Sequence, residues 1–291
     1  MSIKIYINGK MHDKKDAKIS VFDHGLLYGD GVFEGIRSYG RLVFKLKEHV
    51  ERLYESAHTL MLKIPMTQNE MIKAICKTLK TNKLDDAYIR LIVTRGEGDL
   101  GLDPRKCKGN AGIIIITDKI VLYPQKFYKE GLDIITVPTR QNLPEALNPQ
   151  IKSLNYLNNI LAKIEAVNSG YEEAIMLNAR GQVTECTGDN IFIIKNKVLY
   201  TPPSHVGALV GITRDAVMDV ARKKKMQVKE TIFTRHDIYN ADECFLTGTA
   251  AETIPVVKVD GRVIGNGKPG KSTLMLMSEF RKLTKTDGVR Y

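Results

Sequence analysis

The sequence has no tryptophan and only four cysteines among 291 residues. These cysteines (Cys76, Cys107, Cys186 and Cys244) form no C-x-x-C pair and no spacing typical of metal ligands. Neither a disulfide scaffold nor a zinc site is therefore indicated. We expect free thiols and no metal.

Long apolar runs are also missing. No segment has the uninterrupted apolar length of a membrane span, and the opening "MSIKIYINGKMHDKKDAK" contains no stretch resembling a signal peptide. We therefore expect a cytoplasmic protein without a membrane partner. With 43% hydrophobic residues, the chain is long enough for a substantial core and for two domains.

Acidic residues are fewer than basic ones, 33 against 44, which gives a formal charge of +11. This sign suits nucleic acid, an anionic surface or small anionic ligands. The densest basic cluster, Ala221 to Lys229, ends an expected helix, where cations meet the helix dipole and commonly face water. Because basic and aromatic residues are not interleaved, we expect no nucleic-acid partner.

The first part of the chain alternates hairpins and helices. Hairpins are predicted across Asn8-Gly9 and at Tyr39 to Arg41. A helix is expected from about Lys47 to Met61, and another begins at Thr67, where Glu70 completes a capping box. One apolar stripe is expected to be buried on the earlier helix: Val50, Leu53, Tyr54, Ala57, Leu60 and Met61.

Two strands follow, "AYIRLIVT" and "GIIIIT", and the second is expected to be buried on both faces. The pattern then weakens from Thr117 to Gly131, around Pro124. We predict an N-terminal α/β domain at 1–120, a connection at 121–131 and a strand-rich C-terminal α/β domain at 132–291. The fold class is α+β.

In the C-terminal part, a strand is expected near 132–137 and a helix after Lys152. That helix should bury a stripe at helical spacing, and Ser169-Gly170 ends it; the stripe is Leu157, Ile160, Leu161 and Ile164. Turns at 179–181 and 196 divide a strand-rich run. A helix following Thr213, an Asp260-Gly261 hairpin and a last helix near 273–283 complete the pattern.

Four features could carry chemistry. Lys152 stands just before the stripe, and Glu185 ends a strand in "GQVTECTGDNIF". "LVGITRDAV" leads through Thr213 into a helix, whose first N–H groups suit phosphate. "LTGTAAET", residues 246–253, is a small-residue turn that allows close backbone approach. Each feature alone is more commonly a solvated residue, an ordinary helix start or a simple turn.

Together these features supply an amine, a carboxylate, a phosphate cradle and a close backbone approach. Pyridoxal phosphate needs this set, because its aldehyde takes a lysine, its ring nitrogen takes a carboxylate and its phosphate takes N–H donors. The ordered set therefore predicts a pyridoxal phosphate enzyme.

The segments Glu185 to Phe192, Leu199 to Thr201 and Leu209 to Arg214 resemble the signature of the class IV pyridoxal phosphate aminotransferases. Within that class the chain is similar to the branched-chain amino acid aminotransferases over nearly its whole length. The resemblance implies a two-domain fold with the cofactor cleft between the domains, and a homodimer or higher homo-oligomer.

The resemblance also implies residue roles. Lys152 would form the Schiff base and carry the proton between the substrate's α-carbon and the cofactor. Tyr156 would lie near the cofactor's phenolic oxygen, and Glu185 on the pyridine nitrogen. The groups implied on the phosphate are Arg52, the main chain of Ile212 and Thr213, and the Thr249 hydroxyl.

For Arg52, helical spacing and the family resemblance lead to different expectations. By helical period it faces away from the apolar stripe, so spacing alone favours a solvated arginine, whereas the resemblance requires its face to line the cofactor cleft. "YGDGVFEGIRSYGR" resembles the family's substrate-pocket segment, with Tyr28, Phe33 and Gly35 as the implied wall. In a hairpin such residues are commonly just core.

In "AYIRLIVT", Tyr88 and Arg90 share one strand face, an arrangement suited to a carboxylate. The resemblance assigns this pair to the glutamate side chain, and Thr249 and Ala250 to the α-carboxylate. The implied reaction is amino transfer from leucine, isoleucine or valine to 2-oxoglutarate, giving branched-chain 2-oxo acids and L-glutamate. D-Amino acid aminotransferases and aminodeoxychorismate lyases, which generally lack the Tyr-x-Arg pattern, are the alternatives.

One motif in the sequence is typical of a different class of protein, the P-loop NTPases. "GNGKPGKS", Gly265 to Ser272, fits the P-loop pattern in full. Only one helix and a short tail follow it, which leaves no room for the parallel strands and magnesium-binding Asp of an NTPase. We therefore keep a P-loop NTPase only as a remote alternative, and we expect Lys271 near a helix start on the surface.

Overall fold

The computed structural model describes residues 2–119 and 123–291, which fall into two compact units. The first contains Met1–Ile120, Ile151–Asn155 and Thr284–Tyr291; the second contains Val121–Gln150 and Tyr156–Leu283. This division differs from the sequence-based one, since Lys152 and the C-terminal tail lie with the first unit. Of the predicted connection at 121–131, residues 121 and 122 lie outside the described residues and Gln125–Glu130 form a helix. Both units combine helices with sheets, so the fold is α+β.

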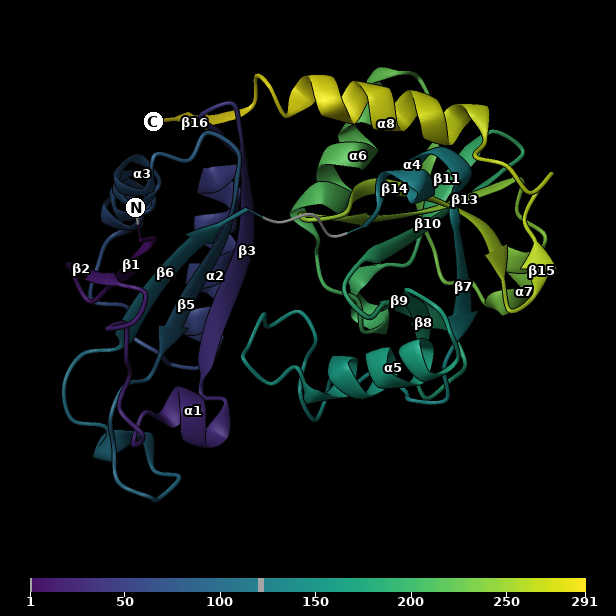
Figure 1. Ribbon diagram of the computed structural model, residues 1–291. Coiled ribbons are helices and arrows are strands. Elements are labelled where there is room, and N and C mark those ends of the chain that lie inside the picture. The colour runs from purple at the N-terminus through teal and green to yellow at the C-terminus, as the bar shows by residue number, and fades with distance from the viewer. Residues whose placement is uncertain (1, 120–122) are drawn as a thin grey trace. The chain divides into compact units, whose positions relative to one another are not determined.

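The first unit is a seven-stranded antiparallel sheet with helices, in the strand order β16-β4-β3-β5-β6-β1-β2. Its elements are β1 (Lys4–Ile7), β2 (Lys10–Asp13), α1 (His24–Tyr28), β3 (Gly31–Tyr39), β4 (Leu42–Phe44), α2 (Leu46–Thr59), α3 (Gln68–Asn82), β5 (Ala87–Thr94), a short 3₁₀ helix (Pro104–Lys106), β6 (Gly112–Asp118) and β16 (Gly288–Arg290). Both termini belong to this unit, and β16 extends the sheet beside β4 (Figure 1).

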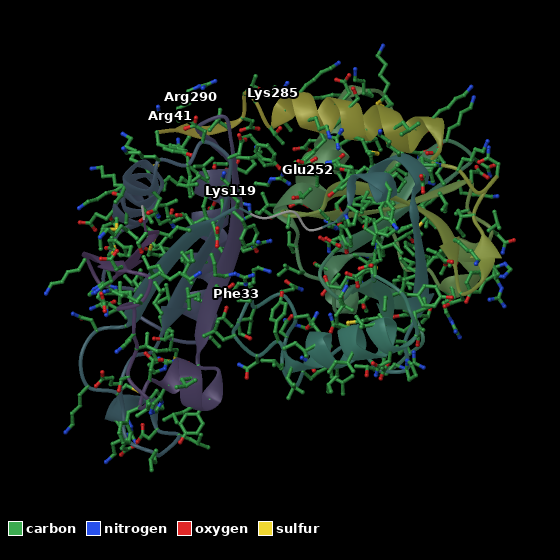
Figure 2. The ribbon with its side chains drawn as sticks, in the orientation of Figure 1. Phe33, Arg41, Lys119, Glu252, Lys285 and Arg290 are labelled. Carbon is green, nitrogen blue, oxygen red and sulfur yellow. The ribbon has the colours of Figure 1, made fainter. Side chains whose placement is uncertain are left out.

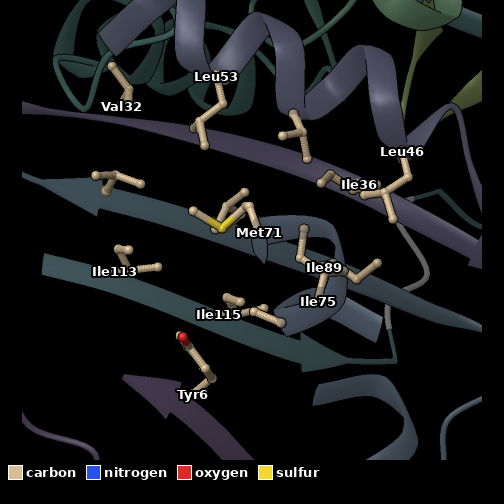
Figure 3. Packing of buried hydrophobic residues seen from close by; sticks show 14 of the residues in the cluster. Tyr6, Val32, Ile36, Leu46, Leu53, Met71, Ile75, Ile89, Ile113 and Ile115 are labelled. Atoms are coloured by element: carbon tan, nitrogen blue, oxygen red, sulfur yellow. The ribbon is translucent and has the colours of Figure 1, made fainter. Parts of the chain in front are cut away.

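The core of the first unit lies between its sheet and the helices α2 and α3. Leu53 of α2, Met71 of α3 and Ile89 of β5 are fully buried in it (Figure 3). The predicted hairpins are confirmed, and so is the capping box at Thr67 and Glu70.

Two burial predictions for this unit are wrong. Met61 is 88% exposed because α2 ends at Thr59 and Met61 lies beyond it in the left-handed region. The strand β6 is not buried on both faces: Ile113 and Ile115 are buried, whereas Ile114 and Ile116 are only partly covered. In this antiparallel sheet, α3 packs on one face, which leaves the other more open.

The second unit is built on a nine-stranded mixed sheet, with the order β12-β11-β10-β13-β14-β7-β8-β9 and β15 paired to β14. Its elements are α4 (Gln125–Glu130), β7 (Leu132–Thr136), α5 (Leu157–Asn168), β8 (Ala174–Leu177), β9 (Val183–Cys186), β10 (Asn190–Lys195), β11 (Val198–Thr201), a 3₁₀ turn (Ser204–Val206), α6 (Ile212–Lys223), β12 (Val228–Glu230), α7 (Arg235–Tyr239), β13 (Glu243–Gly248), β14 (Glu252–Val259), β15 (Arg262–Val263) and α8 (Lys271–Leu283). The sheet is mixed because β7 runs parallel to both β14 and β8.

The helix α5 contradicts the predicted burial. Its apolar stripe is not buried; the side chains Leu157, Ile160, Leu161 and Ile164 are all about half exposed or more. The face that packs inward carries Ala162 and Ala166, which are fully buried beside β8. Small side chains let the helix approach the sheet closely, so the larger ones point away.

Candidate active site

Lys152 lies in a short segment, Ile151–Asn155, that runs along the beginning of β3. The Phe33 N–H donates to the Lys152 carbonyl at 3.0 Å, and the Lys152 N–H donates to Ser56 Oγ of α2 at 3.2 Å. This length of β3 is open to the segment because β4 pairs only with the far end of the strand. Backbone contacts to a strand and a helix therefore fix the lysine in the first unit.

The side chains predicted for the substrate gather on the face of this sheet that points away from the core. Strand alternation puts Phe33 and Gly35 of β3 there with Tyr88 and Arg90 of β5. The Lys152 Nζ and the Arg90 Cζ each lie 4.6 Å from the centre of the Phe33 ring. Figure 2 labels Phe33 in the first unit. Arg90 Nη2 donates to the Tyr88 hydroxyl at 3.2 Å.

Position 35 requires a glycine. A Cβ there would lie 2.1 Å from the Tyr88 hydroxyl oxygen, so the tyrosine can cross over β3 only because no side chain is present. Lys152, Phe33, Gly35 and the Tyr88–Arg90 pair thus form one group, which we call the ring face.

Tyr28 has other neighbours. It ends α1, its hydroxyl donates to the Leu100 carbonyl, and its ring meets the His24 ring edge-on with centroids 5.1 Å apart. The structure therefore places this predicted wall residue beside the loop around Leu100, and its part in the substrate pocket stays a prediction.

Arg52 is buried, with only 8% of its surface exposed, so the expectation from spacing of a solvated arginine is wrong. Its Nε and Nη2 donate to the two carboxylate oxygens of Glu34, at 2.7 and 2.8 Å. The Nδ1 of His49 lies 2.8 Å from Glu34 Oε2. Glu34 and His49, which sequence reasoning missed, therefore fix the guanidinium that the resemblance assigns to phosphate.

The charges in this cluster can be assigned. Burial opposes ionisation of Glu34, but the Arg52 guanidinium, with help from His49, lowers the pKa of that carboxyl to about 2. Burial lowers the pKa of His49 against the opposing effect of Glu34, so the neutral ring donates its Nδ1–H to the carboxylate. One sequence signal could have revealed the cluster: Glu34 stands between Val32 and Ile36 on the core-facing side of β3.

In the second unit, Glu185 of β9 is buried and held by three donors. Gln141 Nε2 donates to Oε1 at 2.8 Å, while the Leu209 N–H and Asn190 Nδ2 donate to Oε2 at 2.9 and 3.3 Å. Donors to both oxygens favour an ionised, oriented carboxylate. Gln141 could not have been predicted, because it lies 44 residues from Glu185.

The start of α6 fits an anion. Its N-cap is Gly211, which supplies no capping side chain to the first N–H groups, those of Ile212 and Thr213. Thr249 and Ala250 form the turn that joins β13 to β14. Tyr156 is the N-cap of α5. A carboxylate for a ring nitrogen, helix N–H donors for phosphate and a lysine amine are all present, so the chain's donor set fits pyridoxal phosphate.

The P-loop interpretation fails on structure. The N–H groups of Ser272 and Thr273, at the start of α8, donate to the Glu243 carboxylate at 3.1 and 2.7 Å. A carboxylate thus occupies the place that a nucleotide phosphate would need. The strand before the loop, β15, also pairs antiparallel with β14 instead of entering a parallel βαβ unit.

Over the described ranges, 2–119 and 123–291, no group of three or more His, Cys, Asp or Glu side chains is arranged to hold a metal ion. None of the helices in these ranges combines the length and the apolar character needed to cross a membrane. All four cysteines are free thiols.

The amino-transferase class IV family profile matches residues 31–259. The chain belongs to this family. It is 54% identical, over 99% of both chains, to a putative branched-chain-amino-acid aminotransferase of Methanocaldococcus jannaschii. This class IV aminotransferase also superposes on the crystal structure of the Escherichia coli branched-chain amino acid aminotransferase with a TM-score of 0.95, at 34% identity, covering 98% of this chain and 95% of that one.

A "T.th." branched-chain amino acid aminotransferase, complexed with N-(5'-phosphopyridoxyl)-L-glutamate, superposes on this class IV aminotransferase with a TM-score of 0.91. The two share 35% identity, over 98% of this chain and 95% of that one. The cofactor of the class IV aminotransferases is pyridoxal 5'-phosphate, and the donor set described above fits it.

Proposed function

We propose that this enzyme transfers the amino group of leucine, isoleucine or valine to 2-oxoglutarate, giving branched-chain 2-oxo acids and L-glutamate. The observation that carries the proposal is the ring face, where the Lys152 amine and the Arg90 guanidinium lie at equal distances from one Phe33 ring. An apolar surface and a cation beside one amine suit a site that must accept both an aliphatic side chain and a carboxylate.

Different residues bind different parts of the substrates. Arg90 and Tyr88 bind the side-chain carboxylate of glutamate and 2-oxoglutarate by charge-assisted hydrogen bonds. Phe33, Gly35 and Tyr28 form the wall for the aliphatic side chain. The turn at Thr249 and Ala250 takes the α-carboxylate, which both kinds of substrate share.

The cofactor-binding residues hold pyridoxal phosphate at three points. Glu185 holds the proton on the ring nitrogen, and Tyr156 lies near the phenolic oxygen. Arg52, the N–H groups of Ile212 and Thr213, and the Thr249 hydroxyl bind the phosphate.

When bound, pyridoxal phosphate supplies an electron sink for the bond broken at the substrate α-carbon. Lys152 would hold the cofactor through its Nζ, and the same atom would move a proton to and from the substrate α-carbon.

Three considerations favour branched-chain substrates over those of other class IV enzymes. The relatives named above are branched-chain aminotransferases, and one of them was crystallised with a phosphopyridoxyl derivative of L-glutamate. The Tyr88–Arg90 pair is also present, hydrogen-bonded and on the ring face. D-Amino acid aminotransferases and aminodeoxychorismate lyases generally lack that pair.

We also propose that the enzyme is a cytoplasmic homodimer or higher homo-oligomer, as expected from the family resemblance. The uncharged outer stripe of α5 supports a second copy as its cover: Leu157, Ile160, Leu161, Ile164 and Val167 are exposed side by side on one helix. Contiguous exposed apolar patches of this kind mark protein interfaces. A chain carrying a charge of +11 would associate with its own copy most readily through such an uncharged face.

An absorbance experiment tests the function directly. We expect the purified protein with pyridoxal phosphate to show a visible band that changes on adding L-leucine and is restored by 2-oxoglutarate. D-Leucine should leave the band unchanged. A band that responds to D-amino acids but not to L-leucine would favour the D-amino acid aminotransferases instead.

A further inference from the structure

A buried pair of carboxyl groups in the second unit has no part in the function proposed above. Glu173 precedes β8 and Asp189 precedes β10, and both are almost fully buried. The Tyr123 hydroxyl lies 3.4 Å from Glu173 Oε2 and 3.4 Å from Asp189 Oδ2. Two carboxyl groups therefore meet at one phenol inside the protein.

Hydrogen-bond donors are divided unequally between the two acids. Glu173 Oε1 accepts from the Ala174 N–H at 2.7 Å, and from the Thr187 N–H and hydroxyl at 3.0 and 2.5 Å. These three donors satisfy Glu173 Oε1 as an acceptor. The Tyr123 hydroxyl has a single proton and cannot donate to both acids. If Asp189 carries a proton, it donates to Tyr123, which then donates to Glu173, so all three groups are satisfied.

Asp189 also lies against the turn assigned to the anionic groups of cofactor and substrate. A Cβ on Gly248 would be 1.9 Å from Asp189 Oδ1, so the carboxyl group is packed directly against the backbone that leads into Thr249 and Ala250. An ionised Asp189 would place a buried negative charge beside a turn that must bind phosphate and carboxylate. A protonated one supports the turn without opposing its ligands.

We infer that Asp189 holds a proton in the folded protein and is a positioning residue for the Gly248–Ala250 turn, through the chain from Asp189 to Tyr123 to Glu173. The inference rests on the proposed function for the ligands of the turn, but the proton itself does not depend on that function.

The surrounding charges agree with this assignment. Burial, then the negative charge of Glu173 and more weakly that of Glu185, raise the pKa of Asp189 to about 7, while Lys163 and the Tyr123 hydrogen bond oppose them. Burial and the same acids also raise the pKa of the neighbouring Cys186 thiol, so that group stays neutral. Asp189 is then the group that loses a proton as the solution becomes alkaline.

The sign of the effect on stability follows. In the unfolded chain Asp189 titrates near its ordinary value of about 4. Between pH values of about 4 and about 7, Asp189 is protonated in the folded state but ionised in the unfolded state. The free energy of unfolding therefore falls as the pH rises through this window, and it levels off above it. Asp189→Asn keeps the shape and a donor to Tyr123 but cannot ionise.

The experiment compares wild type, Asp189→Asn and a control, Glu145→Gln, which neutralises an exposed acid of the same unit. Thermal unfolding of the protein without cofactor is followed from pH 5 to pH 8.5. We expect the wild type to lose several degrees of Tm relative to Asp189→Asn across this range, and Glu145→Gln to behave as the wild type. Parallel Tm curves for wild type and Asp189→Asn would overturn the inference.

A second measurement addresses the turn. The dissociation constant of pyridoxal phosphate, read from its visible band, should rise for the wild type relative to Asp189→Asn by roughly two- to tenfold from pH 6 to pH 8.5. Taking the ratio of the two dissociation constants, wild type over Asp189→Asn, removes the effect of the cofactor's own phosphate titration. A constant ratio, with the cofactor bound, would contradict the positioning role, whereas no band for the wild type at any pH would instead contradict the proposed function.

Tyr123→Phe provides an independent check should Asp189→Asn fail to fold. Removing the hydroxyl breaks the link between the two acids, so the midpoint of the stability change should move. An unchanged midpoint would break the proposed chain between the two acids.

Discussion

The helices α2 and α5 depart from helical periodicity in opposite ways. In α2 the charged Arg52 and the polar His49 are buried against Glu34, whereas in α5 the apolar Leu157 and Ile160 are 66% and 51% exposed. Within α2 most of the predicted apolar stripe is buried and polar residues are buried in addition, whereas in α5 the predicted stripe is exposed. The difference teaches that the partner packed on a helix, and not periodicity alone, decides which side chains are buried.

The physical reasons differ. In α2, Glu34 supplies the charge and the acceptors that make burial of Arg52 tolerable. In α5, Ala162 and Ala166 allow the close approach to β8, and the larger side chains are left for another surface. The first arrangement is complete within one chain, whereas the second leaves an apolar face exposed.

The largest expected effect comes from breaking the α2 arrangement. Glu34→Gln removes the charge that compensates Arg52, and an uncompensated buried charge costs about 3–5 kcal/mol of unfolding free energy. Urea unfolding at neutral pH measures this loss. Glu51→Gln, an exposed acid on the same helix, should stay within about 0.5 kcal/mol of wild type, and an equal loss in both variants would refute the account.

The same ion pair also has a pH signature. Because the pKa of Glu34 is lowered to about 2 from an ordinary 4.5, its stabilisation is complete above about 4.5 and is lost as the pH falls toward 2. Glu34→Gln should lack this part of the acid-induced loss. If its acid unfolding curve had the same slope as that of the wild type, the carboxylate would not be ionised in the folded protein.

An intermediate effect is expected on the ring face, where we propose that Arg90 binds the carboxylate of a ligand. Arg90→Ala should cost about 1.5–3 kcal/mol in the half-reaction with 2-oxoglutarate, which is roughly ten- to a hundredfold in kcat/KM. The leucine half-reaction should change little. Single-turnover spectra measure each half separately.

The control for this variant is Arg41→Ala, another arginine placed over an aromatic ring, that of Tyr291, in the first unit. It should leave both half-reactions unchanged. A parallel fall of both halves in Arg90→Ala would mean that Arg90 only braces the strand.

The smallest effect on the stability of the single chain is expected on α5. Ile164→Asp introduces a charge at an exposed position, so monomer unfolding should change by no more than about 0.5 kcal/mol. The assembled enzyme, however, should dissociate, and light scattering would show the change in mass. Val263→Asp, at a position on β15 that is somewhat more exposed, should not alter the mass; if Ile164→Asp behaved in the same way, α5 would not be the interface.

Local patterns were enough to predict most of the elements. The hairpin at Asn8-Gly9, the capping box at Thr67 and Glu70 and the strand "AYIRLIVT" depend on neighbouring residues, and all three are present. The ring face followed partly from strand alternation, which places Tyr88 and Arg90 together, and partly from the family resemblance.

The supporting residues could not be predicted because they depend on distant contacts. Gln141 meets Glu185 across 44 positions, and Tyr123 meets Asp189 across 66. The docking of Lys152 beside Phe33 depends on a segment that leaves the second unit and pairs with β3. No spacing within either segment encodes these pairings, so they appear only when the sheets are assembled.

The central claim is that Lys152 on the ring face carries the cofactor. Borohydride reduction of the enzyme with pyridoxal phosphate, followed by peptide mapping by mass spectrometry, tests it most directly. The account predicts one phosphopyridoxyl-modified site, at Lys152, and its loss together with essentially all turnover in Lys152→Ala. Modification of a different lysine in the active wild type would contradict the claim.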